Sequence, residues 1–311
     1  MSKEIPKPEK TEDDYLKDHL SSFESPLRSD PSTKKAPSSS RSTDLQFISV
    51  DITELPCGNL YPRGTSLMVR SAQVREIQSY SMVDDKNIYD IFEKMNDMLK
   101  SCVRIKFPDG EMGSYLDLKD QDRIYTIFLI RELTFQQGNT LAVDAECACG
   151  CQNQIELKRS SFKFHKMDDK ISKYYSERTN SFVFNISNGK EFELTVPSIG
   201  ISKSFTEYIV KENIDNKKPN MAFLKIIPYM LENRNSITYD GIKSKLVMFQ
   251  GLDDISFQFL NSAVNKMTLG VEGLRTECTE CGLEVHTEMT FPNGASGIFV
   301  IHDAFEAFIK E

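Results

Sequence analysis

Two short cysteine turns are the part of this sequence that could do chemistry. Cys278 and Cys281 lie in a C-x-x-C-G turn, in which two thiolates can chelate one metal ion and the glycine lets the backbone approach the sulfur. Cys147, Cys149 and Cys151 form a second, compressed turn that also contains a glycine. Two such turns side by side supply four sulfurs, the number that tetrahedral zinc requires. We therefore expect one structural zinc ion.

The separation of the two turns sets a condition on this site. Cys278 follows Cys151 by 127 positions, far more than the spacing within a compact zinc finger. Loop-closure entropy grows slowly with length, so the separation is tolerable if a folded block is inserted into a zinc ribbon. The first turn offers three thiols for two places, and we expect Cys147 with Cys149 or Cys151. His286 is an alternative ligand, although a histidine on a surface strand is the simpler interpretation.

Two other interpretations of the thiols stay open. They could be free or buried thiols of a ribbon that no longer binds metal, or a C-x-x-C redox site. The redox interpretation is weaker, because Cys278 does not open a strand-to-helix turn of the thioredoxin type. The seven cysteines, an odd number, do not suit a disulfide scaffold and favour a reducing compartment.

Composition and motifs argue against several classes of function. The chain has 38 basic and 46 acidic residues, a net charge of −8, whereas non-specific nucleic-acid binders usually carry the opposite sign. No run of 18 apolar residues occurs, so no transmembrane helix or membrane partner is expected. The sequence lacks a nucleophile elbow, a phosphate loop and a dinucleotide fingerprint. We expect no enzyme, no catalytic residue and no small-molecule substrate.

The elements predicted around the cysteines give an α+β fold, a small mixed domain with a zinc-ribbon-like β element interrupted by a helical insert. Apolar spacing predicts helices, one of them capped by Ser71 and another with Asp120 and Asp122 in its first turn. Asp253 and Asp254 are predicted to cap a later helix. The predicted helices are 71–76, 86–101, 118–133, 202–213, 219–234, 240–250, 253–267 and 303–310. The predicted strands are 45–52, 65–71, 102–107, 140–145, 154–157, 181–186, 190–196 and 283–291.

Composition shifts divide the chain into five parts. Residues 1–45 are rich in serine and proline and poor in apolar residues, which predicts a disordered tail. The parts are the tail of 1–45, a mixed α/β domain of 46–160 with the first cysteine turn, a β-hairpin region of 161–200, a helical insert of 201–269, and a β return of 270–311 with the second cysteine turn and a C-terminal helix.

An ordered series of short motifs accompanies these elements. The motifs are Leu55-Pro56, Gly58 and Leu60-Tyr61-Pro62, then Val69-Arg70, Leu99-Lys-Ser-Cys102-Val, Leu118-x-Asp120-x-Asp122-Arg123, Ile127-Phe128-Leu129-Ile130-Arg131-Glu132-Leu133-Thr134, Cys147 with Gly150, and Cys278-x-x-Cys281-Gly282. In this order the series resembles the baseplate proteins, the hub and hub-assembly subunits, of T-even-like contractile-tailed bacteriophages. The resemblance covers residues 45–160 and 270–300, and the compressed first cysteine turn departs from a regular knuckle.

The resemblance implies a structural or assembly role in the tail baseplate of a virion. Its partners would be other phage tail baseplate or hub proteins, and the protein would reside in the host cytoplasm during assembly.

Two other functions are alternatives to this role. A zinc-ribbon nucleic-acid-binding or transcription-type factor would need a basic face, and an enzyme would need a thiol of low pKa. Six glutamates around the predicted ribbon argue against both: Glu146, Glu156, Glu277, Glu280, Glu284 and Glu288.

Overall fold

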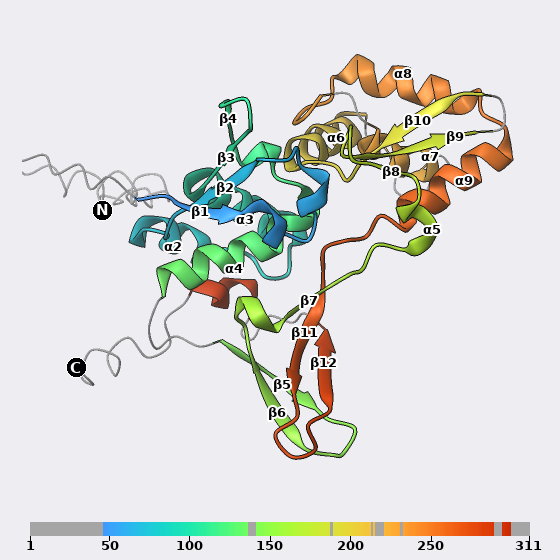
Figure 1. The fold of residues 1–311 in the computed structure, drawn as a ribbon. Helices are drawn as coiled ribbons and strands as arrows, with labels where there is room; N and C mark the ends of the chain where they lie inside the picture. The colour runs from blue at the N-terminus through green and yellow to red at the C-terminus, as the bar shows by residue number, and fades with distance from the viewer. Residues whose placement is uncertain are drawn as a thin grey trace, which may run out of the picture. The chain divides into compact units, whose positions relative to one another are not determined.

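Small antiparallel sheets and short helices make up the part of the chain that the computed structural model describes, residues 46–135, 141–186, 189–212, 214, 221–230, 233–288 and 294–299 (Figure 1). The fold class is α+β, as the sequence predicts. The predicted tail of 1–45 and the predicted helix of 303–310 lie outside the described residues. Among the described helices, none has the length and apolar character needed to cross a membrane.

A four-stranded meander organises the N-terminal body, which we define as residues 46–135. Its strands are β1 (Ile48–Asp51), β2 (Ser66–Val69), β3 (Val103–Lys106) and β4 (Met112–Gly113), paired antiparallel in that order. Buried and less buried residues alternate along β2 and β3, as expected for strands with one face on a core.

Three helices accompany this sheet: α2 (Val74–Ser81), α3 (Ile88–Cys102) and α4 (Arg123–Thr134). In α3 the three- and four-residue apolar spacing buries Met95, Met98, Leu99 and Cys102, and Asn87 caps the first turn. The predicted cap at Ser71 is wrong. The cap is Gln73, two residues later, and helix α2 begins at Val74 with a capping box in which Glu76 accepts the Gln73 N–H at 2.8 Å.

The segment before α4 also differs from the prediction. The helix expected from residue 118 begins at Arg123, and two short 3₁₀ turns, η3 (Tyr115–Asp117) and η4 (Asp120–Asp122), precede it. Asp122 does not lie in a solvated first turn, because its side chain is completely buried.

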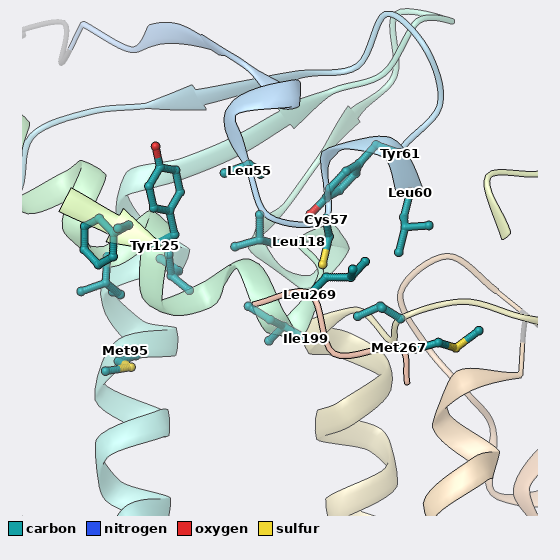
Figure 2. Close-up of a cluster of buried hydrophobic side chains, with 14 of the residues drawn as sticks. Leu55, Cys57, Leu60, Tyr61, Met95, Leu118, Tyr125, Ile199, Met267 and Leu269 are labelled. Carbon is teal, nitrogen blue, oxygen red and sulfur yellow. The ribbon is translucent and has the colours of Figure 1, made fainter. Parts of the chain in front are cut away.

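Asp122 is the centre of a buried polar cluster, which we call the Asp122 hub. Its carboxylate accepts the Cys57 backbone N–H at 2.8 Å and the Tyr61 hydroxyl at 2.6 Å, and the Tyr61 oxygen accepts the Lys119 N–H at 2.7 Å. Burial raises the pKa of Asp122 to about 6 and lowers the pKa of Lys119 to about 8. Figure 2 shows Cys57 and Tyr61 in the apolar cluster that surrounds the hub.

The block that we call the insert, residues 165–270, combines a small sheet with helices. Its sheet has the order β10 (Glu191–Leu194), β9 (Ser181–Asn185), β8 (Tyr175–Ser176), and the short helix α5 (Asp169–Ser172) precedes it. The helices that follow are α6 (Ile199–Lys211), α7 (Met221–Ile226), α8 (Tyr239–Gln250) and α9 (Asp254–Asn265).

Aromatic contacts join this sheet to the helices. The rings of Phe184 in β9 and Phe259 in α9 are 5.6 Å apart, and those of Phe192 in β10 and Phe249 in α8 are 6.3 Å apart. The predicted boundary between residues 200 and 201 therefore falls between elements that share a core. Asp253 caps α9 as expected, because its carboxylate accepts the Ser256 N–H at 2.9 Å.

Backbone hydrogen bonds tie the insert to the N-terminal body. The Asp120 N–H donates to the Pro197 carbonyl at 2.9 Å, and the Ile199 N–H donates to the Leu118 carbonyl at 2.8 Å. The Lys119 ammonium donates to the Val196 carbonyl at 2.9 Å. Ile199, Met267 and Leu269 from the insert belong to the same buried cluster as the residues around the hub (Figure 2).

Gly200, in the first turn of α6, is a position that only glycine fits. A Cβ atom there would lie 2.0 Å from the Asn235 carbonyl oxygen. We expect Gly200→Ala to destabilise the protein by about 2 kcal/mol despite the better helix propensity of alanine. Gly251→Ala is the control, because the nearest atom to its Cβ is 3.5 Å away. Chemical denaturation of both variants checks this, and equal stabilities would contradict the packing described.

Candidate metal centre

Both cysteine turns are the connections of β-hairpins. Strands β5 (Ala142–Glu146) and β6 (Gln152–Glu156) pair antiparallel around the first turn, and β11 (Val271–Glu277) and β12 (Glu284–Glu288) pair around the second. Strand β7 (Phe162–Phe164) pairs with the other edge of β11. We call these five strands and their turns the ribbon.

The two turns have similar backbone patterns, although the second turn is one residue longer. The backbone N–H of Cys147 donates to the Cys151 carbonyl at 2.9 Å, and the backbone N–H of Cys278 donates to the Leu283 carbonyl at 2.8 Å. In each turn a glycine N–H donates back to the carbonyl of the first cysteine, at 2.8 Å for Gly150 and 3.0 Å for Gly282. Both glycines have positive φ, +86° and +71°, a conformation that other residues rarely adopt.

Four sulfurs, two from each turn, come together. The sulfurs of Cys147 and Cys281 are 3.5 Å apart, those of Cys149 and Cys278 are 3.7 Å apart, and all four lie within 4.8 Å of one another. A tetrahedral zinc ion with Zn–S bonds of about 2.3 Å places its sulfurs about 3.8 Å apart. The four cysteines could therefore hold one metal ion.

Cys151 and His286 do not belong to this group. The first turn offers Cys147 and Cys149, while Cys151 closes the hairpin through its carbonyl and packs, partly buried, against the core. His286 lies exposed on β12 with its Nε2 atom 2.9 Å from Glu284. Of the three thiols that compete for two places in the first turn, the structure thus brings Cys147 and Cys149 together with Cys278 and Cys281.

Asn153 is a site residue that the sequence did not reveal. Its amide nitrogen donates to the Cys278 sulfur at 3.6 Å and to the Cys151 carbonyl at 3.1 Å, and its oxygen accepts the Thr279 N–H at 3.2 Å. It therefore cross-links the two turns beside the sulfurs. An asparagine at a buried position of a strand is unusual, and that was the available signal.

Backbone N–H groups stabilise negative charge on two of the four sulfurs, whereas the pKa values of Cys147 and Cys281 are raised beside the neighbouring thiols. Hydrogen bonds from the N–H groups of Cys281 and Glu280 lower the pKa of the Cys278 thiol to about 6, and the Cys151 N–H lowers the pKa of Cys149. Metal binding requires thiolates, so these bonds favour the binding of a cation by one thiol of each turn, Cys149 and Cys278. A set of four thiolates leaves no open coordination position, which is typical of structural rather than catalytic zinc.

The insert leaves and re-enters the ribbon between paired strands. Phe164 of β7 lies opposite Val271 of β11, and the His165 N–H donates to the Gly270 carbonyl at 3.0 Å. Strands β7 and β11 therefore bring the two ends of the insert together. The sulfur group instead joins the tips of two hairpins.

The surface of the ribbon is acidic. All six glutamates named from the sequence are exposed. The positive charges of nearby cations are neutralised by carboxylates. The ion pairs are Lys158 with Glu156 at 3.0 Å, Lys163 with Glu272 at 3.1 Å, and Arg275 with Glu284 at 3.7 Å. This surface does not favour phosphate groups.

Comparison with known proteins adds no relative to these observations. No protein-family model, no curated protein and no solved structure matches the chain.

Proposed function

We propose that this chain is a structural or assembly subunit of a contractile phage tail baseplate, which acts by binding other proteins and is stabilised by one zinc ion. The observation that carries the proposal is the order of the short motifs that resemble those of baseplate proteins. The Asp122 hub brings together motifs of this series that lie more than 60 positions apart in the sequence.

The motif residues serve one buried arrangement. The Tyr61 hydroxyl from the first motif donates to Asp122 from the Leu118-to-Arg123 motif, and so does the backbone N–H of Cys57, which lies between residues of the first motif. Leu55, Leu60 and Leu118 pack in the same core. The hub therefore makes these residues part of one folded core, and the proposed family role itself rests on the order of the motifs.

Zinc is the metal that the donor set favours. Four cysteine sulfurs suit zinc or an iron–sulfur cluster, and sulfurs that all lie within 4.8 Å of one another fit a single ion. The closed ligand set supports a structural role, and reduced cysteines agree with assembly in a host cytoplasm.

The rival function is a zinc-ribbon nucleic-acid-binding factor. Exposed glutamates on both hairpins of the ribbon disfavour it, because phosphate contacts need a surplus of lysine and arginine. A filter-binding assay with duplex DNA and single-stranded RNA separates the two. The proposal predicts no salt-dependent binding of either nucleic acid. The rival predicts binding whose affinity falls steeply as the salt concentration rises from about 50 to about 200 mM.

A nonsense mutation in the gene for this chain, in the phage that encodes it, tests the proposed role. Electron microscopy of the lysate should show filled heads and no complete contractile tails. The wild-type chain and Cys151→Ser, supplied from a plasmid, should restore tails, whereas Cys278→Ser should not. Normal tails in the mutant lysate would overturn the proposal.

A further inference from the structure

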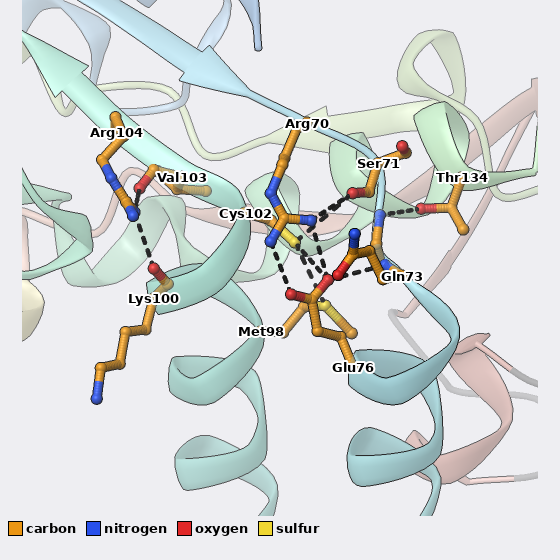
Figure 3. A network of polar contacts seen from close by, with 11 residues as sticks. Arg70, Ser71, Gln73, Glu76, Met98, Lys100, Cys102, Val103, Arg104 and Thr134 are labelled. Atoms are coloured by element: carbon orange, nitrogen blue, oxygen red, sulfur yellow. Dashed lines mark hydrogen bonds and ion pairs between the residues drawn. The ribbon is translucent and has the colours of Figure 1, made fainter. Parts of the chain in front are cut away.

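A basic hollow lies between α2 and α3 at the ends of β2 and β3. Figure 3 shows some of its lining residues, among them Arg70, Glu76, Lys100 and Arg104. Its volume is about 580 Å³, within the range of small-molecule sites. Five cations line it: Arg70, Arg75, Lys94, Lys100 and Arg104. This concentration is unexpected on a chain whose net charge is −8.

Most of these cations lack a carboxylate partner. The charge of Arg70 is neutralised by Glu76, whose two carboxylate oxygens accept hydrogen bonds from two guanidinium nitrogens at 2.7 and 2.9 Å. Among the described residues, no carboxylate forms an ion pair with Arg75, Lys94, Lys100 or Arg104. Asp97 is the remaining acidic residue of the lining, which leaves three positive charges in excess.

The walls of the hollow are held in place. The Arg70–Glu76 pair is buried, with side chains 5% and 9% exposed, and Glu76 also accepts the Gln73 N–H that begins α2 (Figure 3). The Arg104 guanidinium donates to the carbonyls of Lys100 and Val103 at 2.8 and 2.6 Å. These bonds fix α2 and the last turn of α3 on either side of the hollow, so a ligand would meet a preformed site.

Helix dipoles do not account for the cluster. Lys100 lies near the C-terminus of α3, where a cation is stabilised, but Arg75 lies in the first turn of α2, where a cation is destabilised. Arg75 and Lys94, on different helices, face the same hollow. The arrangement therefore has an electrostatic cost that an anion in the hollow would remove.

We propose that this hollow binds a small anion with two or more linked phosphate groups. Three excess positive charges match a diphosphate better than a single carboxylate, and arginine forks with lysine ammonium groups are the usual donors to phosphate oxygens. The hydroxyls of Ser79 and Ser101 lie on the same walls and can add neutral hydrogen bonds. This site is separate from the ribbon and does not depend on the proposed baseplate function.

Titration calorimetry on the full zinc-loaded chain, at about 150 mM salt, tests the proposal with tripolyphosphate and with ADP. The wild type should bind at least one of them with one site per chain. The double variant Arg75→Glu/Lys94→Glu should weaken binding at least about tenfold. Tighter binding of ADP would identify a nucleotide, and equal or tighter binding of tripolyphosphate would identify phosphate alone; both support the site.

Lys211→Glu/Lys243→Glu is the matched control. It makes the same change in net charge at two exposed lysines of α6 and α8, outside the hollow, and should bind as the wild type does. Unchanged circular dichroism and zinc content would show that each double variant is folded. The proposal is overturned if neither ligand binds, if the two double variants weaken binding equally, or if poly-glutamate displaces both ligands at equal concentration of charge.

Discussion

Replacing Cys278 with serine should abolish the bound metal and lower the melting temperature by about 6 °C. The substitution removes one of four sulfurs, and Cys149, 3.7 Å away, loses its neighbour in the group. A metal that binds only the folded state, at free concentrations about a thousandfold above its Kd, contributes a stabilisation of this size in a chain of this length. Metal analysis and differential scanning calorimetry of the purified variant measure both effects.

Cys151→Ser is the control for this prediction. It makes the same chemical change in the neighbouring cysteine turn, but Cys151 is not a member of the sulfur group. The control should keep its metal and melt within a few degrees of the wild type. If both variants lost metal equally, or if Cys278→Ser kept it, the assignment of the four ligands would be wrong.

Asp122→Asn should destabilise the protein by about 3 kcal/mol. The neutral amide has one acceptor oxygen where the carboxylate has two, so the buried Cys57 N–H or the Tyr61 hydroxyl is left without its present partner. A buried donor without a partner costs about 1–3 kcal/mol, and Lys119 loses a neighbouring negative charge as well. Urea denaturation at pH 7 measures the change. Asp144→Asn on exposed β5 is the control and should change stability by less than about 0.5 kcal/mol.

The pH dependence gives the Asp122 prediction a second readout. The pKa of Asp122 is raised to about 6 in the folded protein, so between pH 4 and pH 6 the folded state binds a proton more readily than the unfolded state. Its contribution to stability is therefore complete at low pH and is lost as the pH rises through 6. The stability advantage of the wild type over Asp122→Asn should grow as the pH falls from 7 to 4. An advantage that shrank over this range would show that Asp122 is not buried as described.

Local patterns were sufficient to predict many of the helices and strands. In α3 the apolar stripe and the cap at Asn87 specify the same helix, so the prediction of 86–101 lies within two residues of Ile88–Cys102. The two cysteine turns could also be recognised from the sequence, because the turn itself needs a glycine beside the paired thiols. Such features depend on neighbours in the sequence, which is why they can be recognised without a structure.

Features that depend on distant partners could not be recognised in this way. Asp122 has the appearance of an ordinary acidic residue at a helix start, and its burial follows only from Cys57 and Tyr61, more than 60 positions earlier. The pairing that brings the ends of the insert together was beyond such patterns too, because β7 is three residues long and its pairing with β11 spans more than 100 positions. The choice of Cys149 over Cys151 depends likewise on where the second turn lies.

The proposed zinc ion would join the two hairpin turns through the four sulfurs of Cys147, Cys149, Cys278 and Cys281. The most direct test is metal analysis of the full chain, purified under reducing conditions without chelators, together with zinc X-ray absorption spectroscopy. One zinc per chain, surrounded by four sulfurs at about 2.3 Å, is the expected result. A chain that contains no zinc, or zinc with nitrogen or oxygen among its ligands, would contradict the proposed site.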